Sequence, residues 1–155
     1  LHLMVADPIK EAVLWMSVPQ IKRVFFHYEA IEKNNIEHTI RELGRGGWQV
    51  GLVLNPETTI EVVDAHVEHL DAVMFMGVHP GFQGQTYIPE TTERMKKLKR
   101  KYPNLFISLD GGVNLQTLPD IIKSGISAAC PGSAVFHTDK TPAKNVADIK
   151  ALINN

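Results

Sequence analysis

The residues of this sequence that could do chemistry lie toward the ends of short apolar runs or in the loops that follow them. They are His2, Met4, His27, Glu29, Asn55, Met76, His79, Asp110, Gly132 and Ser133. By side-chain type, His2 and Asp110 are good ligands for a divalent metal, although two ligands far apart in sequence do not make a metal site. A histidine inside an apolar strand is also commonly packed in a core, and Met4 and Met76 also suit a core.

Two glycine-containing turns late in the chain could bind an anion. Residues 110–112 (DGG) follow one apolar run, and residues 131–133 (PGS) follow the next, each before a helix-like segment. Glycine lets backbone N–H groups approach an anion, and the N-terminus of a helix adds a favourable dipole. Each turn alone is also explained as a tight turn, but two on consecutive strands are typical of the phosphate site of a parallel barrel.

A third candidate is the segment HPGFQGQ at residues 79–85, which contains two glycines. It is long enough to fold over a ligand and exclude water. The alternative is a flexible surface loop.

The elements that must position these residues alternate along the chain. Strands are predicted at residues 1–5, 23–28, 48–55, 71–78, 104–110 and 126–132, and helices at 8–17, 31–43, 58–69, 89–101, 115–124 and 142–153. Such alternation predicts an α/β fold whose parallel strands are joined by helical crossovers. Reactive groups then belong at the carboxyl ends of the strands. A hydroxyl cap at Thr58 or Thr59, with Glu61, and a start at Thr141-Pro142 are expected for two of the helices.

Composition restricts the class of protein. The chain has 155 residues, 44% hydrophobic and 21% charged, which predicts one domain over residues 1–155. With 16 Lys and Arg against 17 Asp and Glu it has no basic field for nucleic acid or an anionic membrane. A single cysteine, Cys130, and the absence of a long apolar run predict a cytoplasmic protein.

The average length of a strand-helix unit bears on the architecture. Six strand-helix units in 155 residues average about 26 residues each, so a closed barrel of eight needs about 200, two units more than are present. An open doubly wound sheet would be complete with six strands. The chain begins inside an apolar run, at Leu1 rather than Met, which predicts that it is a piece of a longer protein.

Taken in order, six motifs resemble the ribulose-phosphate 3-epimerase family over essentially the whole chain. They are HLMV at 2–5, HYEA at 27–30, GLVLNPET at 51–58, MFMGVHPGFQGQ at 74–85, SLDGGVN at 108–114 and PGSAVF at 131–136. The resemblance implies a (β/α)8 TIM barrel represented from its third strand to its C-terminus, without the first two βα units.

The same resemblance implies an isomerase of carbohydrate metabolism, in the pentose phosphate pathway. It would interconvert D-ribulose 5-phosphate and D-xylulose 5-phosphate through an enediolate, with a divalent metal (Zn, Fe(II), Mn or Co) and two acid/base carboxylates. The metal ligands fall on His2 and Asp110, and Asp110 is also one of the catalytic carboxylates. The phosphate and substrate contacts fall on Gly81, Phe82, Gln83, Gly84, Gly111, Gly112, Gly132 and Ser133, and the cavity-lining methionines on Met4 and Met76.

Departures from the family pattern leave two further hypotheses open. No motif resembling HIDVMDG exists here, so the second metal histidine and the second aspartate are absent, and Gln83 and His79 replace the family's usual residues. One alternative is a catalytically incomplete fragment that binds phosphorylated sugars. The other is an epimerase of a hexulose phosphate such as allulose 6-phosphate. Six strands would leave bare sheet edges, which predicts a homo-oligomer.

Overall fold

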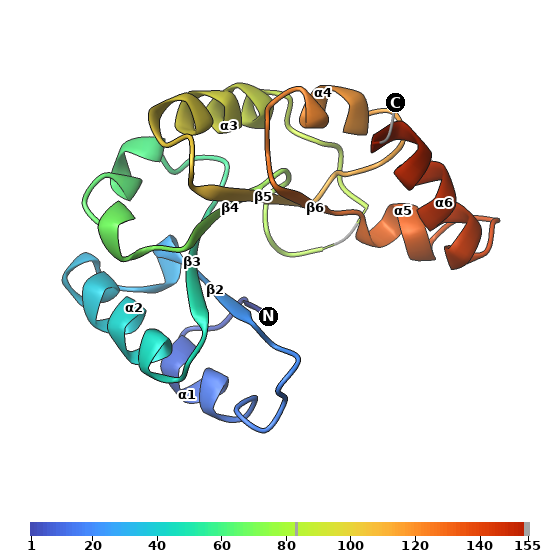
Figure 1. The fold of residues 1–155 in the computed structure, drawn as a ribbon. Helices are drawn as coiled ribbons and strands as arrows, with labels where there is room; N and C mark the ends of the chain where they lie inside the picture. The colour runs from blue at the N-terminus through green and yellow to red at the C-terminus, as the bar shows by residue number, and fades with distance from the viewer. Residues whose placement is uncertain (83, 154–155) are drawn as a thin grey trace. The chain divides into compact units, whose positions relative to one another are not determined.

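The computed structural model describes residues 1–82 and 84–153, and its fold is α/β, as the alternating pattern predicts. The strands are β1 (His2–Leu3), β2 (Arg23–His27), β3 (Gln49–Leu54), β4 (Ala72–Met76), β5 (Phe106–Asp110) and β6 (Ala128–Cys130) (Figure 1). They are neighbours in sequence order within one sheet. The registers of β1 with β2, β2 with β3, and β5 with β6 are parallel. All six strands therefore fall inside predicted runs.

Helices follow the strands along the chain (Figure 1). The α-helices are α1 (Pro8–Val13), α2 (Ile36–Arg45), α3 (Glu90–Lys101), α4 (Leu118–Ile122), α5 (Gly132–Phe136) and α6 (Pro142–Ile153). The 3-10 helices are η1 (Tyr28–Ala30), η2 (Lys33–Asn35), η3 (Ile60–Val63) and η4 (Val67–His69). The expected start of the last helix is confirmed, because α6 begins at Pro142 and the Thr141 hydroxyl accepts a hydrogen bond from the Lys144 N–H.

The structure of residues 58–69 differs from the helix predicted there. It forms two 3-10 helices rather than one α-helix, and Thr59 at the start of η3 makes no side-chain capping bond. The Thr58 hydroxyl instead donates a hydrogen bond to the Glu29 carboxylate. A hydroxyl held by a distant carboxylate cannot cap a helix, so the predicted capping box is wrong.

The chain divides into two compact units, Leu1–Met74 and Phe75–Asn155. In unit 1, α2 packs on the sheet with Ile36, Ile40 and Leu43 buried, and β2 and β3 are almost entirely buried. Burying one such apolar side chain, relative to leaving it exposed, stabilises the fold by roughly 1.5 to 3 kcal/mol. Gly51 in β3 lies beneath the Phe25 ring, where an added Cβ would collide with the aromatic carbons.

Unit 2 is built around β5 and β6 and the helices that follow β4, β5 and β6. Its buried residues include Met95 and Leu98 of α3 and Ile107 and Leu109 of β5. The buried Asn145 side chain donates to the Val135 carbonyl at 2.8 Å, which fixes α6 against α5.

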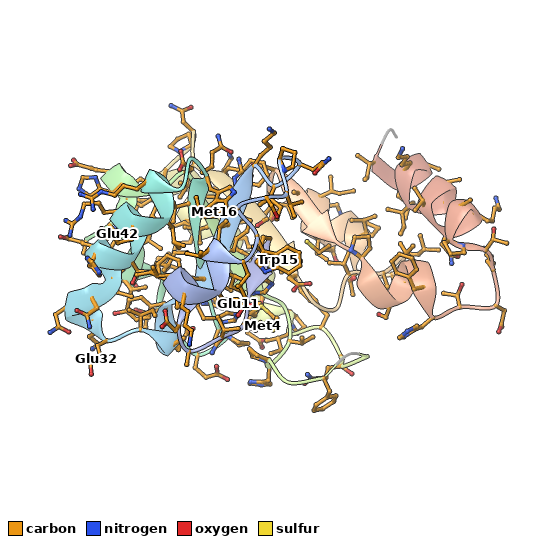
Figure 2. All side chains as sticks on the ribbon, turned by 90° about the horizontal axis from the view of Figure 1, so that it is seen from below. Met4, Glu11, Trp15, Met16, Glu32 and Glu42 are labelled. Atoms are coloured by element: carbon orange, nitrogen blue, oxygen red, sulfur yellow. The ribbon has the colours of Figure 1, made fainter. Side chains whose placement is uncertain are left out.

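Several large apolar side chains of unit 1 are exposed. Figure 2 labels Met4, Trp15 and Met16. Leu14, which precedes Trp15 in the sequence, is 71% exposed. Among the residues described, no helix is long and apolar enough to span a bilayer.

Candidate functional site

Four polar residues lie together near the carboxyl ends of β1, β2 and β3. His27 is the last residue of β2, Glu29 follows in η1, and Asn55 directly follows β3. His2 lies in β1, next to β2 in the sheet. Because these strands are parallel neighbours, residues far apart in sequence meet at one end of the sheet.

Hydrogen bonds join the four residues into one network within unit 1. The Nε2 atoms of His2 and His27 are 2.9 Å apart, and the other ring nitrogen of His27, Nδ1, is 3.1 Å from Asn55 Oδ1. The same Nδ1 is 3.6 Å from a Glu29 carboxylate oxygen. His27 is buried, at 7% exposure, so its ring is held inside this network rather than by water.

Glu29 is the anionic member of the network. Partial burial raises the pKa of its carboxyl group, but hydrogen bonds from His27, from the Thr58 hydroxyl and from the Asn55 backbone N–H outweigh this effect. The net result is a pKa below the usual value. The carboxylate is therefore ionised at neutral pH and can only accept hydrogen bonds.

In unit 2, Asp110 ends β5 and the double-glycine turn follows at once. Both glycines have positive φ, +91° at Gly111 and +71° at Gly112, a region that other residues rarely adopt. An added Cβ at Gly112 would lie 2.8 Å from the Cα of Tyr87, so the turn also needs glycine for space.

Asn114 and Thr117 hold this turn in place. The Thr117 hydroxyl donates to the Gly112 carbonyl at 2.8 Å, and the Asn114 carboxamide oxygen accepts from the backbone N–H groups of Gln116 and Thr117. Neither residue was predicted from the sequence as part of the site. The signal was an asparagine two residues after the second glycine, followed three residues later by a threonine.

The second turn lies beside the first. β6 pairs with β5 so that Cys130 is opposite Asp110, and Gly132 and Ser133 follow as the first residues of α5. Partial desolvation and the charge of Asp110 raise the pKa of the Cys130 thiol, which therefore stays protonated at neutral pH. Unit 2 thus brings Asp110 and both predicted phosphate-binding turns to one end of neighbouring strands.

The loop after β4 closes on the same region. The Gly77 N–H donates to the Asp110 carbonyl at 2.7 Å, and the Ile88 N–H donates to the Gly77 carbonyl at 2.8 Å. Within the loop, the Gln85 side-chain amide donates to the carbonyls of His79 and Phe82. Gly81 and Gly84 have positive φ and Phe82 is 73% exposed. Gln83, also predicted as a substrate contact, lies outside the described residues.

The remaining predicted residues fall in different environments. Met4 is 53% exposed, whereas Met76 is 2% exposed. His2 belongs to unit 1 and Asp110 to unit 2.

The donor set available here does not by itself make a metal centre. A bound divalent metal commonly takes three or more protein ligands. Among residues 1–82 and 84–153, no three His, Cys, Asp or Glu side chains are grouped so that they could hold a metal ion. The metal role of His2 and Asp110 therefore stays a prediction.

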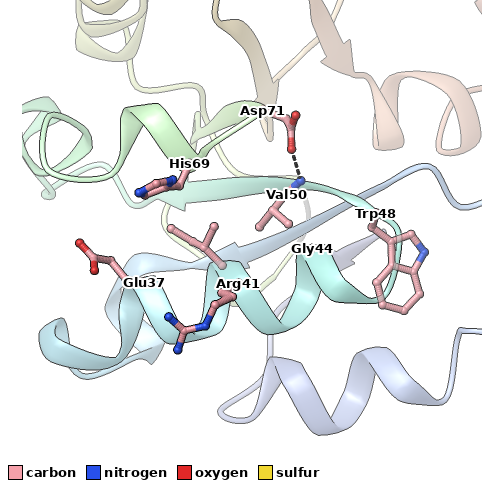
Figure 3. A pocket seen from close by; sticks show the side chains of 8 residues that line it. Glu37, Arg41, Gly44, Trp48, Val50, His69 and Asp71 are labelled. Atoms are coloured by element: carbon pink, nitrogen blue, oxygen red, sulfur yellow. Dashed lines mark hydrogen bonds between the residues drawn. The ribbon is translucent and has the colours of Figure 1, made fainter.

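A pocket of about 330 Å³ lies elsewhere in unit 1 (Figure 3). Its lining includes Glu37 and Arg41 of α2, Trp48, and His69 of η4. Asp71, also in the lining, accepts a hydrogen bond from the Val50 N–H. The pocket is therefore at the start of β3, whereas ligands of parallel α/β proteins bind at the carboxyl ends of strands.

Comparison with known proteins gives a consistent result. The model of the "Ribulose-phosphate 3 epimerase family" matches residues 1–136. The ribulose-phosphate 3-epimerase of Schizosaccharomyces pombe is 38% identical over 136 residues, and the match covers 88% of this chain and 58% of that protein. The ribulose-phosphate 3-epimerase of Escherichia coli K12 is 31% identical over 151 residues, covering 95% of this chain and 65% of that protein. The chain thus spans less than two thirds of these relatives.

Solved structures confirm the fold. Orotidine 5'-monophosphate decarboxylase from Sulfolobus solfataricus has a TM-score of 0.73 at 12% identity, covering 99% of this chain and 71% of that one. A 3-hexulose-6-phosphate synthase has a TM-score of 0.71 at 18% identity, covering 95% and 69%. The six strands are therefore part of a TIM-barrel pattern, and the barrel is incomplete in this chain.

Proposed function

Because this chain belongs to the ribulose-phosphate 3-epimerase family, we propose that it carries part of the catalytic machinery for epimerising D-ribulose 5-phosphate to D-xylulose 5-phosphate. The observation that carries the proposal is in unit 2. There a carboxylate, Asp110, ends β5 directly before a glycine turn that Asn114 and Thr117 hold, and a second glycine turn follows the neighbouring strand.

These residues divide the work between holding the sugar and moving a proton. The backbone N–H groups of Gly111, Gly112, Gly132 and Ser133 bind the phosphate, because the glycines leave room for an anion at the backbone. The phosphate anchors the sugar so that the carbon next to its ketone lies within reach of Asp110. The Asp110 carboxylate then removes or returns the proton on one face of that carbon.

Inversion needs a second acid/base group on the opposite face, and that group belongs to the part of the relatives that this chain does not match. Enzymes of the family generally depend on a metal, which when bound stabilises the negative charge of the enediolate oxygens. Among the described residues no complete donor set for that metal is found, so phosphate binding and proton transfer are assigned to this chain's own residues.

The direct test is an epimerase assay with D-ribulose 5-phosphate. We expect conversion when the chain is supplemented with the part of the Schizosaccharomyces pombe relative that it does not match, with added Zn²⁺, Mn²⁺, Co²⁺ or Fe(II). The matched control carries Asp110→Asn. Conversion equal to that of the control would overturn the proposal. Parallel assays with allulose 6-phosphate measure whether a hexulose phosphate is the better substrate.

A second function is favoured by the lack of a three-ligand metal group among the described residues. In this alternative the chain binds phosphorylated sugars without turning them over. Calorimetric titration with D-ribulose 5-phosphate would then give the same affinity with and without a chelator. For the epimerase, chelation weakens both binding and turnover.

A further inference from the structure

We propose that Tyr87 is a positioning residue for phosphate binding, because its ring packs on the glycine turn after β5 and holds the backbone of Gly112 in place for the ligand. Tyr87 acts through Gly112 and does not itself touch the phosphate. The phosphate as ligand rests on the proposed function, whereas the contact of Tyr87 with the turn rests on the structure alone.

The first step is the space around two glycines that follow different strands. Gly77 directly follows β4, and Gly112 is the second glycine after β5. A Cβ added at Gly77 would lie 2.9 Å from two carbons of the Tyr87 ring, and one at Gly112 would lie 2.8 Å from the Cα and Cβ of Tyr87. In a close-packed interior such distances are not tolerated, so Tyr87 occupies the space that side chains at both positions would need.

Tyr87 is in turn fixed from the side of α3. Its hydroxyl lies 2.7 Å from the hydroxyl of Thr92, a residue of the first turn of α3 that is buried. Partial desolvation raises the pKa of the phenol, so the hydroxyl is protonated at neutral pH and can donate. The next residue, Ile88, donates its N–H to the Gly77 carbonyl at 2.8 Å. The ring is therefore held between α3 and the two glycines.

The turn itself is held at other points that do not involve Tyr87. A Cβ added at Gly111 would lie 2.6 Å from the side chain of Val78, which is buried. The Gly112 carbonyl accepts a hydrogen bond from the Thr117 hydroxyl at 2.8 Å. Loss of the Tyr87 ring should therefore loosen the Gly112 backbone locally and leave the rest of the turn in place.

A local change of this kind affects the binding of an anion. Backbone N–H groups bind phosphate well only when they are aligned with its oxygens, and a hydrogen bond weakens steeply as its angle departs from linear. The packing of the ring on Gly112 is the contact that matters, and the hydrogen bond from Tyr87 to Thr92 is secondary.

The test titrates inorganic phosphate into the ¹⁵N-labelled 155-residue chain and follows the amide signal of Gly112. Tyr87→Leu should raise the Kd roughly fivefold to tenfold, which corresponds to the loss of about one hydrogen bond. Tyr87→Phe keeps the ring and should stay within about twofold of wild type. The matched control is Tyr102→Leu, which removes a second half-buried tyrosine at the other end of α3 and should leave the Kd unchanged.

A second measurement needs no phosphate. Hydrogen exchange reports local opening of the backbone, and the N–H groups of Gly77 and Ile88 are bonded beside the Tyr87 ring. Their exchange should be at least about tenfold faster in Tyr87→Leu, and unchanged in Tyr87→Phe and Tyr102→Leu.

The two measurements separate the possible failures. A wild-type chain that binds no phosphate at Gly112 contradicts the proposed function, and the exchange rates then decide whether Tyr87 holds the turn. Faster exchange with an unchanged Kd would reduce Tyr87 to a structural role, and unchanged exchange would remove the contact itself. Either result overturns the proposal.

If Tyr87→Leu does not fold, the wild-type chain decides. We expect nuclear Overhauser effects from the Tyr87 ring to the Hα protons of Gly77 and Gly112, and a shift of the ring signals on phosphate addition with the same Kd as the Gly112 amide. The absence of either signal would overturn the proposal.

Discussion

The polar network of unit 1 and the glycine turns of unit 2 both follow the carboxyl ends of parallel strands, but they are built from different parts of the chain. The network is made of side chains: two histidines, a glutamate and an asparagine that lie within contact distance of one another. The turns are made of backbone, with Gly111 and Gly112 at positive φ. We therefore expect the stability of the first region to depend on charge and that of the second region to depend on backbone conformation.

The largest expected effect is at Asp110, the carboxylate that directly precedes the first glycine turn of unit 2. In the assay supplemented with the unmatched part of the relative, Asp110→Asn should lower kcat at least about 10³-fold, because it removes an acid/base group. Phosphate binding should stay, since the turns are intact. The control is Asp120→Asn in α4, an exposed aspartate paired with Lys123, which should retain turnover. Equal losses in both variants would contradict the assignment.

The conformational sensitivity of unit 2 is tested by alanine in the two turns. Gly112→Ala should lower the free energy of unfolding by about 1 to 3 kcal/mol, since φ is +71° and the new Cβ would lie 2.8 Å from the Tyr87 backbone. Gly132→Ala is the matched control, because no described residue other than its immediate chain neighbours and the backbone of its own helix comes within 4 Å of the added Cβ. Urea denaturation measures both. Similar losses of stability would mean that the two turns do not differ in their need for glycine.

The charge sensitivity of unit 1 is tested at Glu29 by varying pH. Its pKa in the folded chain lies below the ordinary 4.5, so ionised Glu29 stabilises the fold above that pH. This stabilisation is lost as pH falls through the folded-state pKa. Glu29→Gln should therefore cost on the order of 1 kcal/mol at pH 7, and the difference from wild type should shrink below pH 4.5. A difference in unfolding free energy independent of pH would count against an ionic role.

The smallest effect is expected at Ser133. If its backbone N–H makes the main phosphate contact, Ser133→Ala removes only the hydroxyl, and KM should rise roughly twofold to fivefold with kcat nearly unchanged. Steady-state kinetics in the supplemented assay separate the two parameters. A fall in kcat comparable to that of Asp110→Asn would place Ser133 in proton transfer.

Much of the fold was predictable because apolar runs and helix-like segments alternate so regularly. Every strand lies inside its predicted run, and α6 begins at the expected proline. The two 3-10 helices within residues 58–69 were not predictable, since the Thr58 hydroxyl, expected to cap an α-helix, bonds instead to Glu29, a residue 29 positions earlier. α5 was missed because its five residues carry no helical periodicity of their own.

The candidate site was predictable to a similar degree. A turn with positive φ favours glycine, and two adjacent glycines can be recognised in the sequence, so the turn after Asp110 could be predicted. The network could not, because a link between His27 and Asn55 depends on side-chain rotamers and on strand register, which spacing does not reveal.

The hydrogen bond between the Ile88 N–H and the Gly77 carbonyl, which closes the loop after β4, bears on how much sequence change this loop tolerates. Because the Ile88 N–H bonds to the Gly77 carbonyl, the segment between them leaves and rejoins the fold at one point. Lengthening a closed loop costs little entropy, about 0.6 kcal/mol for each doubling. Insertions between these two residues should therefore cost the fold little, while the Asp110 carbonyl still accepts the hydrogen bond from the Gly77 N–H.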